Sequence, residues 1–121
     1  MTKPSSQLWQ TGIELFNAGE FFQCHEVLEE LWNQQSEPEK QLTQGILQIA
    51  VGYLHLGRNN RIGALKLMRK GLIRLEPFLP QAEGLCLERL VAAVLQTVQS
   101  IESESENIPG PPQIERSVNY S

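Results

Sequence analysis

Apolar residues recur every three or four positions along most of this chain, and that period predicts α-helices. Five segments share it: residues 7–18, 20–35, 38–57, 61–76 and 85–101. Glycine, proline and asparagine separate the segments, and the short connections predict that consecutive helices are antiparallel neighbours. No stretch shows the sustained alternation of a half-buried strand. The fold class is therefore all-α, an antiparallel bundle of about five helices built from helical hairpins.

A change of composition after Glu102 divides the chain in two. Residues 1–102 carry the apolar repeats and are numerous enough to form a single helical domain with its own core. Residues 103–121 are rich in Ser, Glu, Pro, Gly and Asn, a composition that predicts a mobile C-terminal tail. We also expect residues 1–4 to be frayed.

Two glycines inside the third predicted helix indicate a close helix contact. Gly45 and Gly52 are seven residues apart, so they lie on one side of the helix. Glycine costs roughly 1 kcal/mol relative to alanine within a helix. The pair therefore predicts that another backbone approaches this side. Gln44, Gln48 and His55 follow the same side of the helix.

Charge and composition exclude several classes of function. A net charge of −4 argues against bulk affinity for nucleic acid, which needs a basic surface. Residues 90–95 form the longest apolar run, which is too short to span a membrane. The N-terminus lacks the apolar stretch of a secretory signal, and both cysteines lie in apolar helical patterns, so we expect a cytoplasmic protein with reduced thiols.

A basic run between residues 58 and 74 holds six of the ten Lys and Arg residues and no acid. We interpret it as the solvated side of the fourth helix. Docking of an acidic partner or a phosphate ligand is the second interpretation.

The second predicted helix carries the candidate chemistry. His25 and Glu29 are one turn apart, on or beside the apolar side formed by Phe21, Leu28 and Trp32. Two ionisable groups beside a side expected to be buried indicate a polar pocket. The candidate ligand-binding residues of that pocket are His25, Glu29, Gln48 and His55.

Three functions remain open for these residues. The first is a structural network, in which a buried imidazole donates to a carboxylate and Glu29 finds a partner. The second is a pocket for an unknown small molecule or a divalent metal, with His25, Glu29 and His55 as the metal ligands. The third is catalysis, with His25 as base, Glu29 orienting it and His55 as acid or ligand.

The leading interpretation is a structural or small-ligand-binding module. The alternative is a metal-dependent or His/Glu acid-base enzyme, hydrolase-like, that uses the same pocket. The pattern lacks the second histidine of metalloprotease helices and the paired Glu-x-x-His sets of di-iron bundles. Apolar edges on the outer helices predict a homodimer.

The same residues carry a family resemblance. Aromatic residues lead into His-Glu-x-Leu-Glu-x-x-Trp, a Gly-x-x-Gln segment follows, and a histidine precedes an Asn turn and Gly-Ala: Phe21, Phe22, His25, Glu26, Leu28, Glu29, Trp32, Gly45, Ile46, Leu47, Gln48, His55, Asn60, Gly63 and Ala64. Over residues 12–79 this pattern resembles the domain of unknown function family 309, small bacterial and archaeal proteins. The resemblance implies a compact all-α fold and supplies no activity. It also falls on the four candidate site residues.

Overall fold

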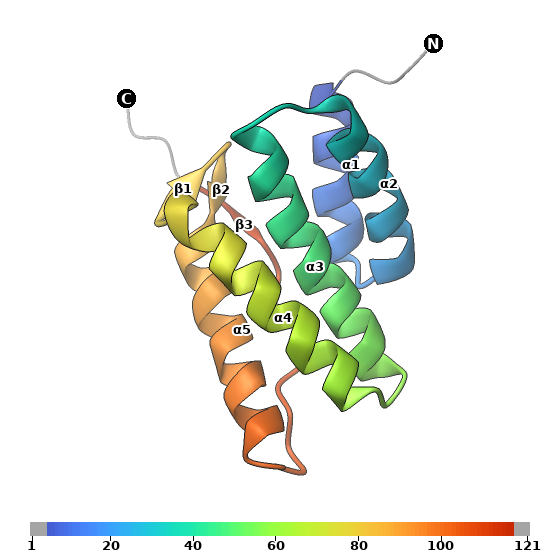
Figure 1. Ribbon diagram of the computed structural model, residues 1–121, viewed down its shortest axis with the longest axis vertical. Coiled ribbons are helices and arrows are strands. Elements are labelled where there is room, and N and C mark those ends of the chain that lie inside the picture. Colours follow the sequence, from blue (N-terminus) through green and yellow to red (C-terminus); the bar gives the residue numbers. More distant parts are fainter. Residues whose placement is uncertain (1–4, 118–121) are drawn as a thin grey trace.

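Five helices in the predicted order make up most of the computed structural model, which describes residues 5–117 (Figure 1). They are α1 (Ser5–Asn17), α2 (Phe21–Gln34), α3 (Glu39–Gly57), α4 (Arg61–Leu75) and α5 (Leu87–Glu102). A single 3₁₀ turn, η1 (Glu76–Phe78), follows α4. The predicted all-α class, and the hairpin order of the helices, are confirmed.

Local sequence signals explain where the helices begin and end. Gly19 has a φ of 75°, a left-handed conformation that closes the α1–α2 turn at little cost. The Asn60 side chain accepts a hydrogen bond from the Gly63 N–H at 2.9 Å and caps α4. Pro77 has no N–H to continue the helix, and α4 gives way to the 3₁₀ turn at Glu76.

A small sheet was not predicted. Strands β1 (Gln81–Ala82), β2 (Leu85–Cys86) and β3 (Glu115–Arg116) pair antiparallel in the order β1-β2-β3. Each strand has only two residues, so none can show an alternating pattern in the sequence. The pairing of β3 also depends on a partner about thirty residues earlier in the chain, which no local pattern reveals.

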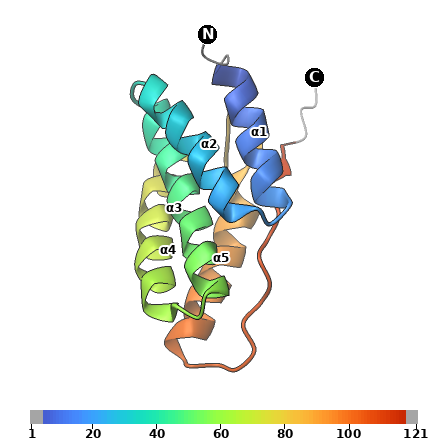
Figure 2. The same cartoon turned by 90° about the vertical axis from the view of Figure 1, so that its right-hand side faces the viewer.

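The segment after α5 differs from the predicted tail. Residues 103–117 turn back along the bundle and reach α1 (Figure 2). Ile114 is only 2% exposed, and the Asn17 side chain both accepts from its N–H at 2.6 Å and donates to its carbonyl at 3.1 Å. One apolar residue and one α1 side chain therefore anchor a segment whose overall composition is polar. Residues 118–121 of that tail, and residues 1–4, lie outside the described residues.

Helix α3 is the centre of the bundle, with α2 on one flank and α4 on the other (Figure 1). Its contact with α4 is close, as the glycine pattern predicted. A Cβ added at Gly52 would lie 2.7 Å from Met68 Cγ, and one added at Gly45 would lie 2.8 Å from Leu75 Cδ2. Gly71 of α4 fits against the Gly45 carbonyl, which an added Cβ would meet at 2.8 Å. The two helices therefore touch at the backbone.

None of the helices between residues 5 and 117 has the length and apolar character needed to cross a membrane.

Candidate functional site

Two hollows lie along the outer side of α3, one toward each flanking helix. The α3–α4 cleft has a volume of about 760 Å³ and is lined by Pro38, Gln41, Gln44, Gln48, Lys70, Ile73, Arg74, Pro77 and Phe78. The α2–α3 hollow has a volume of about 220 Å³ and is lined by His25, Glu29, Trp32, Gln44 and Leu47. Gln44 borders both hollows, so they are neighbours.

His25 and Glu29 form a pair in the α2–α3 hollow. His25 Nε2 lies 3.1 Å from Glu29 Oε2, and the two side chains are 34% and 54% exposed. The prediction that they sit on or beside the buried side is therefore wrong for Glu29 and only partly right for His25. Cys24, Leu28 and Leu31 define the buried side of α2, and His25 lies about a quarter turn away from it.

Trp32 lines the α2–α3 hollow and contacts Gln44, the residue that borders both hollows. Its indole N–H donates to Gln44 Oε1 at 3.2 Å, and the Lys40 ammonium lies 4.0 Å from the centre of its ring. The cation over the ring and the hydrogen bond to α3 hold the half-buried indole in one orientation. Trp32 thereby sets the position of the Gln44 amide.

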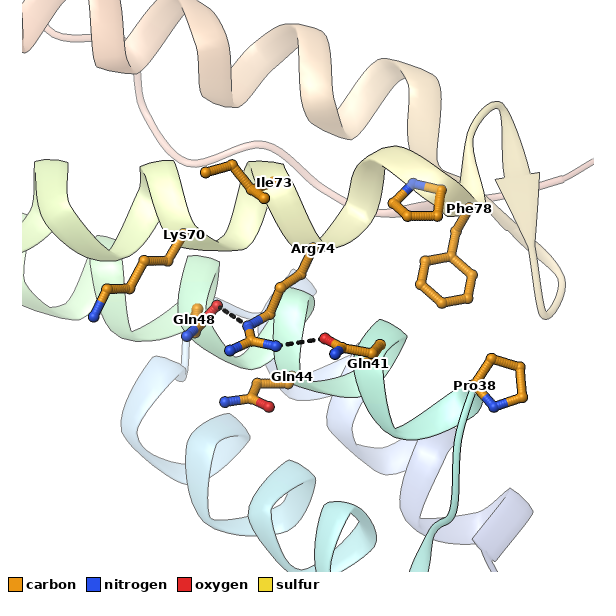
Figure 3. A pocket seen from close by; sticks show the side chains of 9 residues that line it. Pro38, Gln41, Gln44, Gln48, Lys70, Ile73, Arg74 and Phe78 are labelled. Carbon is orange, nitrogen blue, oxygen red and sulfur yellow. Dashed lines mark hydrogen bonds between the residues drawn. The ribbon is translucent and has the colours of Figure 1, made fainter.

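Arg74 is the central polar group of the α3–α4 cleft (Figure 3). Its Nε–H donates to Gln48 Oε1 at 3.1 Å, and an N–H of Nη1 donates to Gln41 Oε1. Gln48 is 9% exposed, so its amide is a fixed point on α3. Two glutamines one above the other on α3 therefore hold the guanidinium in a defined plane. Three of its five N–H groups are not used by these bonds.

The cleft is positively charged. Its lining contains Lys70 and Arg74 and no acid. Within residues 5–117 the carboxylates that contact a basic side chain do so in the pairs His25–Glu29, Arg69–Glu102 and Arg89–Glu115, so none of them pairs with Lys70 or Arg74. In a protein of net charge −4, this cleft is a local site for negative charge.

His55 lies away from both hollows. Its Nδ1 is 3.3 Å from the Asn60 amide nitrogen, at the turn between α3 and α4. It follows Gln48 by seven residues, or about 10 Å along the helix axis. The structure thus divides the four predicted residues: His25 and Glu29 share one hollow, Gln48 lines the other, and His55 is at the turn.

The predicted convergence of His25, Glu29 and His55 on one metal ion is not seen. Within residues 5–117, no three His, Cys, Asp or Glu side chains are grouped so that they could hold a metal ion. The physical reason is distance along α3: His25 and Glu29 share their hollow with Leu47, and His55 follows Leu47 by eight residues, about 12 Å along the helix axis.

Two of the groups with raised pKa values, Cys24 and Tyr53, are in the core. Burial raises the pKa of the Cys24 thiol to about 12, and this thiol donates to the Gly12 carbonyl at 3.3 Å. Burial also raises the pKa of Tyr53, while its hydrogen bond with Thr97 acts in the opposite direction. Both residues support the packing of helices rather than the two hollows.

Sequence reasoning missed Arg74, which was grouped with a solvated basic run. One signal was available, because Arg74 follows Gly71 by three residues and therefore lies near the same side of α4. Gly71 is the residue that meets the α3 backbone. A small residue at a helix contact thus places the arginine at the edge of that contact.

Comparison with known proteins agrees with the pattern described above. Residues 9–67 match the sequence profile of a family described as Domain of unknown function (DUF309). The uncharacterized protein YpuF of Bacillus subtilis (strain 168) is 30% identical over 97 residues, which cover 79% of this chain and 55% of YpuF. The chain therefore spans about half the length of this relative. The profile match contains His25, Glu29, Gln48 and His55 and ends before Lys70 and Arg74.

Proposed function

Residues 9–67 form a DUF309 domain, and from this premise we propose that the chain is a small-ligand-binding module whose α3–α4 cleft holds the anionic group of its ligand. The family carries no assigned activity, so the proposal is supported by the chemistry of the cleft. The observation that carries it is Arg74, a half-buried guanidinium held by two amide oxygens without a carboxylate partner within residues 5–117.

The guanidinium is prepared for an anion. Arginine normally loses side-chain freedom when it binds a carboxylate or phosphate, but the bonds to Gln41 and Gln48 have already restricted this side chain. A planar fork held in one orientation, with three N–H groups left, suits the two oxygens of a carboxylate or phosphate.

The surrounding amides favour the same kind of ligand. Gln41 and Gln48 direct their oxygens at Arg74, and Gln44 directs its oxygen at Trp32. Each of the three glutamines therefore keeps its two amide N–H donors for the cleft or the solvent. A lining of amide donors and cations fits an acceptor group and disfavours a cationic one.

Lys70 adds a second charge on the same helix, one turn before Arg74. Like charges four residues apart on a helix destabilise it by about 0.2–0.5 kcal/mol. An anion bound between them would remove this repulsion. Ligand binding should therefore also stabilise α4.

The test compares Arg74→Gln with Lys66→Gln, which removes a charge from α4 outside the cleft. Acetate and inorganic phosphate are titrated while the NMR signals of the Arg74 Nε–H and the Trp32 indole N–H are followed. We expect saturable shifts of both signals in the wild type and in Lys66→Gln, and no shift of the Trp32 signal in Arg74→Gln at matched ionic strength. Shifts that do not saturate, or a Trp32 shift that is the same in Arg74→Gln, would overturn the proposal.

The acid-base enzyme is the second candidate, and the 3.1 Å contact between His25 and Glu29 favours it. The carboxylate occupies one ring nitrogen, and the other is left to act as a base toward a ligand near Gln44. His25→Ala should abolish any hydrolysis of p-nitrophenyl esters and leave acetate binding intact. A hydrolysis rate equal in wild type, His25→Ala and buffer rules this candidate out.

The same variant tests the structural-network interpretation. A partly exposed pair one turn apart contributes only about 0.3–0.5 kcal/mol to the free energy of unfolding. The melting temperature of His25→Ala should therefore lie within a few degrees of that of the wild type. A large loss of thermal stability would instead identify the pair as a structural network.

A further inference from the structure

The α3–α4 cleft has a polar part and an apolar part. Figure 3 shows Lys70 at one end, Arg74 with Gln48 and Gln41 in the middle, and the rings of Phe78 and Pro38 at the other end. Pro77 lies beside Phe78 in the same apolar part. The charge is therefore concentrated on one side of the cleft and hydrocarbon on the other.

The apolar part is a consequence of how α4 ends. Pro77 cannot extend the helix, and the chain turns through η1, which carries Phe78 across toward the start of α3. Pro38 stands at that start and supplies the facing ring. Two proline rings and one half-buried phenyl ring form a stiff wall, which loses little conformational freedom when it is covered.

The wall is open in the described structure. Pro38 and Pro77 are exposed, and Ile73 at the rim is 70% exposed, among the most exposed large apolar side chains of the described residues. Apolar side chains gathered around a hollow are typical of a ligand pocket when the hollow also contains an arginine that, as here within residues 5–117, has no carboxylate partner. From Lys70 to Pro77 the cleft extends about 10 Å along the helix axis.

We propose that the ligand is an amphipathic monoacid, with a carboxylate on Arg74 and an apolar body against Phe78, Pro38 and Pro77. This inference rests on the proposed function and specifies its ligand class. A compact phosphate would engage the arginine and leave the apolar wall in water. A polyanion such as a nucleotide would need more cations than the two in the lining.

The experiment measures the affinity of the wild type for acetate, butyrate, hexanoate and octanoate by calorimetric titration. Each methylene that leaves water completely tightens binding about fourfold, and a half-covered one about twofold. We therefore expect the dissociation constant to fall two- to fourfold per methylene. Two further ligands separate the contributions of the head group and the tail to the affinity. Hexan-1-ol lacks the carboxylate, and hexylphosphonate carries a phosphonate in its place.

Two variants locate the apolar body. Phe78→Ala should leave acetate affinity unchanged and flatten the dependence on chain length. Leu79→Ala removes the neighbouring apolar side chain, which is 38% exposed and does not line the cleft, and should behave like the wild type. Contacts between the octanoate methyl group and the Phe78 ring protons, observed by NMR in the wild type, test the same point without a substitution.

The outcomes separate the two proposals. Equal affinity for acetate and octanoate, both dependent on Arg74, would overturn the amphipathic ligand and leave the anion site standing. A chain-length dependence that persists in Phe78→Ala, together with no contact between the octanoate methyl group and the Phe78 ring in the wild type, would also overturn the amphipathic ligand. The absence of any Arg74-dependent binding would overturn the proposed function itself.

Discussion

Replacing Gly71 by alanine is a direct test of the helix contact that positions the cleft. The added Cβ would lie 2.8 Å from the Gly45 carbonyl oxygen, 2.7 Å from Ile49 Cγ1 and 3.3 Å from the Ile49 backbone nitrogen. Two of these three atoms belong to the α3 backbone and cannot rotate away, so the helices must move apart. Alanine favours the helical state by about 1 kcal/mol over glycine, and overpacking costs about 3 kcal/mol at the upper end of its usual range.

The expected net loss is therefore about 2 kcal/mol, which corresponds to about 6–10 °C in the melting temperature of a domain this size. The same displacement acts one turn before Arg74, so acetate binding should weaken as well. Urea unfolding followed by circular dichroism measures the stability, and the acetate titration measures the cleft.

Gly57→Ala is the matched control. It changes the last residue of α3, where an added Cβ meets nothing within 4 Å and the backbone φ is not positive. We expect this variant to be as stable as the wild type or up to about 1 kcal/mol more stable. If Gly71→Ala proved as stable as Gly57→Ala, α3 and α4 would not touch at the backbone, and their contact would not position Arg74.

Three further predictions concern the core, the C-terminal segment and self-association. Burial raises the pKa of the Cys24 thiol from 9.0 to about 12, so the unfolded chain loses this proton first and the stability of the fold should fall as pH rises from about 9 toward 12. Cys24→Ala should lose that part of the pH dependence of urea unfolding, and an unchanged dependence would refute the assignment to Cys24. Asn17→Ala removes two hydrogen bonds worth about 1 kcal/mol each, so the Ile114 amide should exchange with solvent at least about tenfold faster, and unchanged protection would contradict its anchoring role. The homodimer stays a prediction: Phe22 is 53% exposed on the acidic outer side of α2 and Ile62 is 84% exposed on the basic outer side of α4. If these sides dock between two copies, sedimentation experiments should show a dimer that dissociates at about 0.5 M salt and is absent in Ile62→Lys. A monomeric wild type would refute the homodimer.

Local physics explains the features that sequence reasoning predicted correctly. Helix periodicity and the turn residues predicted all five helices, because backbone hydrogen bonds and apolar stripes repeat within four residues. The adjacency of His25 and Glu29 followed from the same one-turn spacing. Gly45 and Gly52 indicated a close helix contact, because glycine is rarely kept inside a helix without a packing reason.

The remaining features depend on contacts between distant parts of the chain. Arg74 meets Gln48 and Gln41, which are 26 and 33 residues away. Its spacing from Gly71 placed it near the contact with α3, but the two glutamines that hold it could not be identified from the sequence around it. Ile114 follows Asn17 by 97 residues and packs against α1. Its burial could not be predicted from the polar composition of the segment around it. The exposure of Glu29 was set by the direction in which α2 docks on α3, and that direction comes from the packing of both helices.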